Sequence, residues 1–169
     1  MSFVGGQSLR RALQVKAGVS PTVVMFDIYF LESDPSARRR KEVLRGRIVL
    51  GDYSEEVDTY LDVWNRDLFE LHWLGAAKRL VDDRESSTAF FTTTFQSFWS
   101  MWRRGDAVVV NERLLVKDTL IAHFDPAHLY RQVGRYRRYS DGQPISEWVL
   151  KVSDLRGFIK RRGKKHRAG

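Results

Sequence analysis

Hydrophobic and polar positions along this chain fall into strand-like blocks, interrupted by one clear helical stripe. Residues 22–31 (TVVMFDIYFL) are β-branched and aromatic, which predicts a buried strand. In Val43–Leu50 the apolar side chains take alternate positions, which predicts a half-exposed strand forming a hairpin with the first. From Asp67 to Asp82 apolar residues recur at helical spacing after Asn65, a residue type that caps helix N-termini, so we expect a helix there.

Strands dominate the second half of the pattern, where little chain separates one from the next. Three successive strands predict an antiparallel meander: Thr88–Phe95, Phe98–Arg103 and Ala107–Val116. The remaining expected elements are a helix within Phe124–Tyr136, a strand at Ile145–Val152 and a short helix at Asp154–Lys160. The sequence therefore predicts an α+β fold, an antiparallel β-sheet of about six strands with helices packed on one face, in the order ββαβββαβα.

Length and charge divide the 169 residues into one domain with two appendages. We expect a flexible or loosely docked leader at 1–20, a single domain at 21–160 and a basic disordered tail at 161–169. Of the net charge of +8, seven units lie between Arg156 and Gly169, which leaves +1 for the rest. The chain has no Cys, no apolar run of membrane-spanning length and no secretory h-region, so we expect a cytoplasmic protein that does not enter a membrane.

Charge within the domain is unevenly distributed. The segment Asp52–Glu70 carries seven acids and one base, Arg66, for a charge of −6. A second stretch, Leu129–Tyr139, interleaves arginines with tyrosines. Such a stretch is compatible with nucleic-acid binding or with an amphipathic helix whose basic side chains face solvent.

Residues that would carry chemistry do not occur in productive spacings. The four histidines, His72, His123, His128 and His166, form no i, i+3 or i, i+4 pair with a supporting carboxylate, so no metal site is expected. No phosphate-binding glycine loop and no activated serine motif are present. Paired acids such as Glu55/Glu56 and Asp82/Asp83 lie in polar stretches, which indicates a solvated surface rather than acid–base catalysis. We therefore expect no enzymatic activity and no cofactor.

Several motifs together resemble immunity proteins of bacterial contact-dependent growth inhibition (CDI), the CdiI family. The similarity runs in order over about residues 44–160 and does not include a catalytic signature. Its segments are GRIVLGDYSEEVDTYLDVW (46–64), LHWLGAAKRL (71–80), STAFFTT (87–93), FWSMWRRGDAVVVNERLLV (98–116) and DGQPISEW (141–148), followed by a helix with Leu155 and Phe158.

The resemblance implies a protein that binds and neutralises the C-terminal nuclease domain, a tRNase in related pairs, of a cognate CDI toxin. An RNase cleft is cationic because it holds phosphates, so an acidic surface can occlude it and steer association. The expected partner-binding residues are the acids of one segment: Asp52, Glu55, Glu56, Asp58, Asp62, Asp67 and Glu70. The alternative hypothesis is a small basic nucleic-acid-binding domain that uses Arg131–Tyr139 and the tail.

Overall fold

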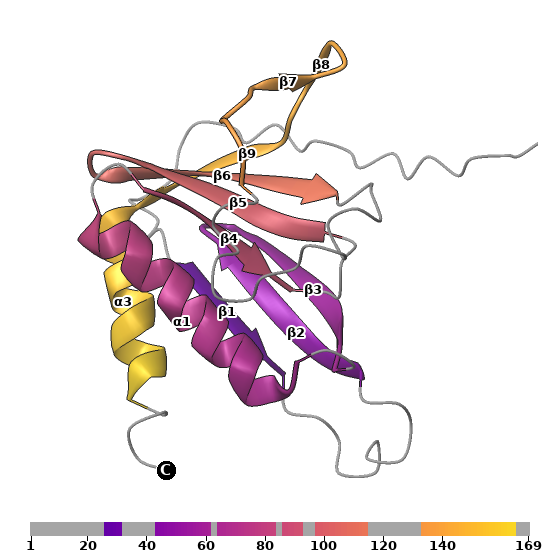
Figure 1. Ribbon diagram of the computed structural model, residues 1–169, viewed down its shortest axis with the longest axis vertical. Helices are drawn as coiled ribbons and strands as arrows, with labels where there is room; N and C mark the ends of the chain where they lie inside the picture. Colours follow the sequence, from indigo (N-terminus) through magenta and orange to yellow (C-terminus); the bar gives the residue numbers. More distant parts are fainter. Residues whose placement is uncertain are drawn as a thin grey trace, which may run out of the picture.

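The computed structural model describes residues 26–31, 43–61, 64–83, 86–92, 97–114 and 133–164 (Figure 1). Within them the chain is α+β with antiparallel strands, as predicted. The elements are β1 (Phe26–Phe30), β2 (Val43–Leu50), β3 (Tyr53–Tyr60), α1 (Arg66–Asp82), β4 (Ser87–Phe91), β5 (Ser97–Arg104), β6 (Ala107–Leu114), β7 (Tyr139–Ser140), β8 (Gln143–Pro144), β9 (Glu147–Lys151) and α3 (Val152–Gly163).

The strands form two main sheets and one small hairpin rather than the single six-stranded sheet expected from the sequence. The first sheet has the order β1-β2-β3 and the second the order β4-β5-β6-β9, while β7 and β8 pair with each other. The predicted hairpin of β1 and β2 is confirmed, with Ile28 opposite Ile48. The predicted meander is also confirmed, since β5 pairs antiparallel with both β4 and β6.

Strand β3 follows Gly51-Asp52, where the sequence pattern predicts no strand after Val43–Leu50. Gly51 adopts φ 69°, a left-handed conformation that glycine takes without steric cost, and this reverses the chain directly into β3. The new strand pairs along the whole of β2, from Leu50 opposite Tyr53 to Val43 opposite Tyr60. Three of the seven acids of the segment, Glu55, Glu56 and Asp58, therefore lie on a strand at the edge of the first sheet.

Helix α1 begins one residue before the predicted start. The Asn65 side chain accepts a hydrogen bond from the Leu68 backbone N–H at 2.9 Å, which confirms the predicted cap. Its buried face carries Phe69, Trp73 and Leu80, the stripe that the spacing indicated. Helix α3 runs to Gly163, three residues beyond the predicted end at Lys160.

The hydrophobic core lies where the inner faces of both sheets meet α1 and α3, which lie side by side (Figure 1). Phe26 of β1 contacts Phe158 of α3 at 5.1 Å and Phe90 of β4 at 5.4 Å between ring centroids. Tyr53 of β3 contacts Trp148 of β9 at 4.8 Å, so the two sheets also pack directly on each other. These aromatic contacts join both sheets and α3 into one core, which α1 enters through Trp73 against Phe30 of β1 at 4.9 Å.

A buried arginine fixes the carboxyl end of α1 to the second sheet. Arg103, 9% exposed on β5, donates through Nη1 to the Leu80 and Val81 carbonyls at 2.9 and 2.6 Å. Its Nε donates to the Gly105 carbonyl at 2.8 Å. These bonds satisfy carbonyls that have no partner within the last turn of a helix. Arg103 is therefore part of the fold, not of the exposed basic surface.

Two arginines of α3 close the other side of the core. Arg162 donates through Nε and Nη2 to both carboxylate oxygens of Asp27 on β1, at 2.9 and 3.0 Å. Its guanidinium also lies over the Tyr29 ring, 4.6 Å from the centroid. Arg161 donates to the Phe26 carbonyl at 2.6 Å. Of the basic residues at the end of the chain, these two are thus engaged in packing α3 against the first sheet.

Outside the two sheets, residues 133–136 form bends rather than the end of the helix predicted at Phe124–Tyr136; the rest of that prediction lies outside the described residues. The turn predicted at Asp141-Gly142 is confirmed and connects β7 to β8. The hairpin projects from the edge of the second sheet (Figure 1).

Candidate functional site

Strand β3 distributes the acidic segment along the first sheet instead of gathering it in one patch. Asp52 precedes the strand and Asp67 follows it in the first turn of α1; both are exposed. An eight-residue strand is about 26 Å long, so these two acids do not lie on one compact surface. Asp62, a further candidate, lies outside the described residues.

The outward acids of β3 face arginines of β2 in register. Glu56 lies opposite Arg47, and Asp58 lies opposite Arg45. Arg47 Nη2 donates to Glu56 Oε1, and Arg45 Nε donates to Asp58 Oδ1 at 3.4 Å. The hydrogen bond that Arg47 donates to Glu56 raises the pKa of Arg47 above its usual value. The outer face of this sheet is therefore a ladder of alternating charge.

The remaining candidates point inward or pair locally. Glu55 is half-buried and accepts a hydrogen bond from the Tyr53 hydroxyl at 2.7 Å. Glu70 is 14% exposed at its side chain and pairs with Arg66 one turn earlier, at 3.1 Å. Of the seven candidate acids, Asp52, Glu56, Asp58 and Asp67 are exposed in the part of the chain that the structure describes.

An apolar pair adjoins the charged ladder at the end of β3. Val43 and Tyr60 are cross-strand partners, 40% and 49% exposed. They lie next to Arg45 and Asp58 on the same outer face, because side chains two positions apart along a strand share a face. We call Glu56, Asp58, Tyr60 and Val43 the β3 face. It combines charge with a partly apolar anchor, as protein interfaces do.

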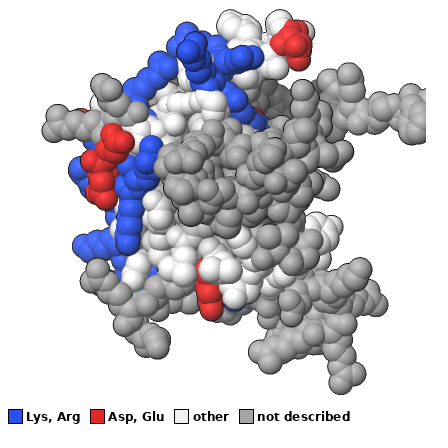
Figure 2. All heavy atoms as spheres, in the orientation of Figure 1, with Lys and Arg blue, Asp and Glu red and all other residues white. Residues whose placement is uncertain are grey.

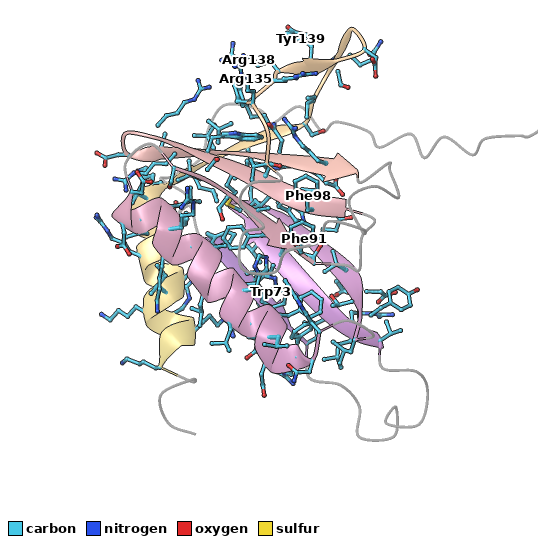
Figure 3. The ribbon with its side chains drawn as sticks, viewed as in Figure 1. Trp73, Phe91, Phe98, Arg135, Arg138 and Tyr139 are labelled. Carbon is cyan, nitrogen blue, oxygen red and sulfur yellow. The ribbon has the colours of Figure 1, made fainter. Side chains whose placement is uncertain are left out.

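His72 is a structural residue. Its Nε2 accepts a hydrogen bond from the Phe91 backbone N–H at 3.1 Å, and its ring packs 5.2 Å from Trp64. Burial lowers the pKa of His72 to about 3, so the ring is neutral at physiological pH. Beside it, Trp73 Nε1 donates to the Phe91 carbonyl at 2.7 Å, and Phe91 stacks on Phe98 (Figure 3). His123, His128 and His166 lie outside the described residues.

A hollow with a volume of about 620 Å³ lies between the β5–β6 turn, β9 and the start of α3. Among the described residues that line it, Asp106 is the single carboxylate, and Lys151 and Arg156 are its cations. This is not the pair of carboxylates that acid–base catalysis would use. Across the described part of the chain, no three His, Cys, Asp or Glu side chains are grouped as metal ligands, and no helix is long and apolar enough to cross a bilayer.

A second charged surface lies at the base of the β7–β8 hairpin, and the sequence stretch Leu129–Tyr139 supplies only part of it. Arg135, Arg137 and Arg138 lead into the β7–β8 hairpin and are exposed; Arg131 lies outside the described residues. Strands β5 and β6 bring Arg104 and Arg113 to the same place. Figure 2 shows Lys and Arg gathered over the base of this hairpin. Arg104 and Arg113 are far from the hairpin in sequence. Arg104 lies over the Tyr136 ring and Arg113 donates to the Arg135 carbonyl, and these tertiary contacts place both at the base of the hairpin.

Comparison with known families gives a match to the CdiI N-terminal domain over residues 59–158, more than half of the chain. The chain belongs to this family. A chain of a solved CdiA-CT/CdiI toxin and immunity complex from Enterobacter cloacae is similar to it, with a TM-score of 0.69 and 19% identity. The alignment covers 83% of this chain and 99% of the other. At 19% identity, this structural similarity establishes that the two chains share a fold. No curated protein matches.

Family membership confirms the resemblance read from the motifs at Leu71–Leu80, Phe98–Val116 and Asp141–Trp148, all of which lie in the matched range. In the structure these motifs are packing and turn features. Trp73 and Trp99 are 2% and 1% exposed in the core, and Gly105, at φ 61°, makes the β5–β6 turn. The matched motifs of this CdiI-type chain therefore stabilise the fold. Residues that contact another protein would lie on the surface instead.

Proposed function

We propose that this protein is a non-enzymatic immunity protein that binds the C-terminal nuclease domain of a cognate CDI toxin and neutralises it. Membership in the CdiI N-terminal domain family over residues 59–158 carries this proposal. It is supported by a fold shared along nearly the whole length of a chain from a toxin and immunity complex. Such a protein would act in the cytoplasm, where the toxin's RNA substrate lies.

We place the docking surface on the β3 face. Its acids would meet the cationic cleft that an RNase, here a tRNase, needs to hold phosphates. Because Glu56 and Asp58 neutralise Arg47 and Arg45, removing the two acids would leave two uncompensated arginines facing the cationic cleft and slow association. Tyr60 and Val43 supply apolar area that a toxin surface would cover.

The test is inhibition of tRNA cleavage by the purified C-terminal domain of the cognate CDI toxin. The wild-type protein is expected to abolish cleavage at an equimolar ratio. The double variant Glu56→Gln/Asp58→Asn is expected to associate roughly fivefold more slowly at low salt, because the charges facing the cleft are lost. Tyr60→Ala is expected to speed dissociation by about tenfold or more, as the loss of a buried aromatic contact does.

The matched control is Asp82→Asn/Asp106→Asn, which removes two exposed acids away from the β3 face and changes the net charge equally. It is expected to leave both rates within twofold of wild type. If inhibition persists but all these variants behave alike, the toxin docks elsewhere on the molecule. If cleavage proceeds undiminished in the presence of excess wild-type protein, the inhibitory function itself is wrong.

A further inference from the structure

The base of the β7–β8 hairpin gathers five arginines, and one carboxylate, Glu147, is linked to Arg138 through the Tyr136 hydroxyl. Among the described residues, none of them lies within 4.0 Å of an acidic side chain, whereas the arginines of β2 and the end of α3 are ion-paired. We call these five residues and Tyr139 the hairpin patch: Arg104, Arg113, Arg135, Arg137, Arg138 and Tyr139.

The patch is built on an aromatic support. The Tyr136 ring meets Trp102 edge to face at 5.4 Å, and Trp102 Nε1 donates to the Gly134 carbonyl at 3.3 Å. The Arg104 guanidinium lies over the Tyr136 ring, 4.3 Å from its centroid, and Arg113 lies 5.1 Å from the Trp102 centroid. These contacts therefore pack residues 134–136, which lead into the hairpin, against the second sheet.

Hydrogen bonds orient the cations of this support. Arg113 Nη2 donates to the Arg135 carbonyl at 3.1 Å, and Arg138 Nε donates to the Tyr136 hydroxyl at 3.1 Å. That hydroxyl in turn donates to Glu147. Burial, together with repulsion from Arg137, lowers the pKa of Arg113. Cations held this close to each other repel, and an anion at the patch would relieve that repulsion.

One aromatic side chain of the patch faces solvent. Tyr139 is 63% exposed at the start of β7, next to Arg138 (Figure 3). The chain places it on a short hairpin that turns at Asp141-Gly142, where Asp141 is the acid of the turn. An exposed ring beside several guanidinium groups provides both a stacking surface for a base and donors for phosphate oxygens.

We propose that the hairpin patch binds single-stranded nucleic acid, with the arginines on consecutive phosphates and a base stacked on Tyr139. All five cations are arginines, whose planar fork suits phosphate oxygens. Arg104 and Arg113 lie on the second sheet and the other patch residues lead into the β7–β8 hairpin or lie on it, whereas the β3 face lies on the first sheet. This activity is thus separate from toxin binding, and either proposal can fail without the other.

The experiment measures fluorescence anisotropy of the full chain with a labelled 12-nucleotide RNA of uridines, from 50 to 300 mM salt, with the same DNA sequence as a second arm. The patch variant Arg135→Gln/Arg137→Gln/Arg138→Gln is expected to bind at least tenfold more weakly. Its log–log salt slope should be smaller by about 2, since each phosphate contact on a single strand contributes about 0.7. Tyr139→Ala should weaken binding by about fivefold or more, and Tyr139→Phe should restore it.

The matched control is Lys78→Gln/Arg156→Gln/Lys160→Gln, which removes three exposed cations from α1 and α3. It is expected to bind within threefold of wild type, with urea unfolding midpoints confirming that all variants are folded. Two results would show that RNA binding depends on nonspecific charge and would overturn the proposal. One is an equal loss of affinity in the control and patch variants; the other is a complete loss of binding on removing residues 165–169. The proposal is also overturned if wild type does not bind at 50 mM salt, or if polyglutamate competes as well as RNA and Tyr139→Ala has no effect.

Discussion

Protonation of His72 couples the stability of the protein to pH. The ring sits between α1 and β4 with Nε2 accepting the Phe91 backbone N–H, which a protonated ring cannot do. Burial lowers its pKa from 6.5 to about 3 in the folded state. Between these values the unfolded chain binds a proton that the folded protein excludes, so stability falls as pH falls below about 6.5 and is fully retained above it.

The size of the effect follows from the two pKa values. Lowering the pH from 7 to 5 changes the free energy of unfolding by about 2 kcal/mol through this residue alone. Because the His72 side chain is half-buried and keeps some contact with solvent, we treat this figure as an upper value. A loss of this size is a substantial fraction of the net stability of a small domain, about 5–15 kcal/mol.

The assay is urea unfolding at pH 7 and pH 5, followed by tryptophan fluorescence, for wild type and His72→Gln. Glutamine keeps an acceptor near the Phe91 N–H but does not titrate in this range. We expect the variant to lose about 2 kcal/mol less than wild type between the two pH values; the other three histidines contribute equally to both proteins. A direct NMR titration of the His72 ring should show no protonation above pH 5. Identical pH dependence in the two proteins, or a midpoint near 6.5, would refute the reasoning.

Three further substitutions test the packing described above by urea unfolding at pH 7. Arg103→Met should lower the free energy of unfolding by about 2–4 kcal/mol, because it leaves the carbonyls at the end of α1 without their donors. The exposed neighbour serves as control, and Arg104→Met should change this free energy by less than about 1 kcal/mol. Equal effects of the two substitutions would contradict the anchoring role of Arg103. Arg162→Met should cost about 1 kcal/mol through loss of its bonds to Asp27, and an unchanged midpoint would argue that α3 is held by its apolar face alone. Trp73→Phe should cost about 1–3 kcal/mol, since the Phe91 carbonyl loses a buried donor and the core loses volume; a neutral result would show that this bond adds nothing.

Elements with a strong local pattern could be predicted from the sequence. The helical stripe follows a capping residue, Asn65, and the run containing Phe26–Phe30 is rich in β-branched and aromatic residues. These features are set by neighbours along the chain. The division into two sheets depends instead on packing between distant segments, such as Tyr53 against Trp148, which no local pattern records.

Strand β3 was missed for a physical reason. Its inward side carries Glu55 beside Tyr53, and its outward side carries acids, so the alternation of apolar and polar residues that marks a strand is weak. What stabilises it is cross-strand pairing with Arg45 and Arg47, an interaction set by register. The same pairing changes the expected docking surface, because acids that appear as a run of −6 in sequence are partly neutralised in the fold.

The hairpin patch could be predicted only in part. The interleaved arginines and tyrosines of 135–139 are visible in the sequence, but they were expected on a helix, and the structure has bends and a short strand. Arg104 and Arg113 join them through Tyr136 and Trp102, residues far apart along the chain. Trp102 itself is 8% exposed beneath this segment, which leaves Tyr139 as the exposed aromatic residue of the patch.

Calorimetric titration of the full chain with a catalytically inactive form of the cognate toxin C-terminal domain tests directly whether this protein binds a CDI toxin. We expect a one-to-one complex with a Kd on the order of 10 nM or tighter, weakened by added salt and by Tyr60→Ala. The absence of measurable heat and of a co-eluting complex at concentrations of tens of micromolar would contradict it.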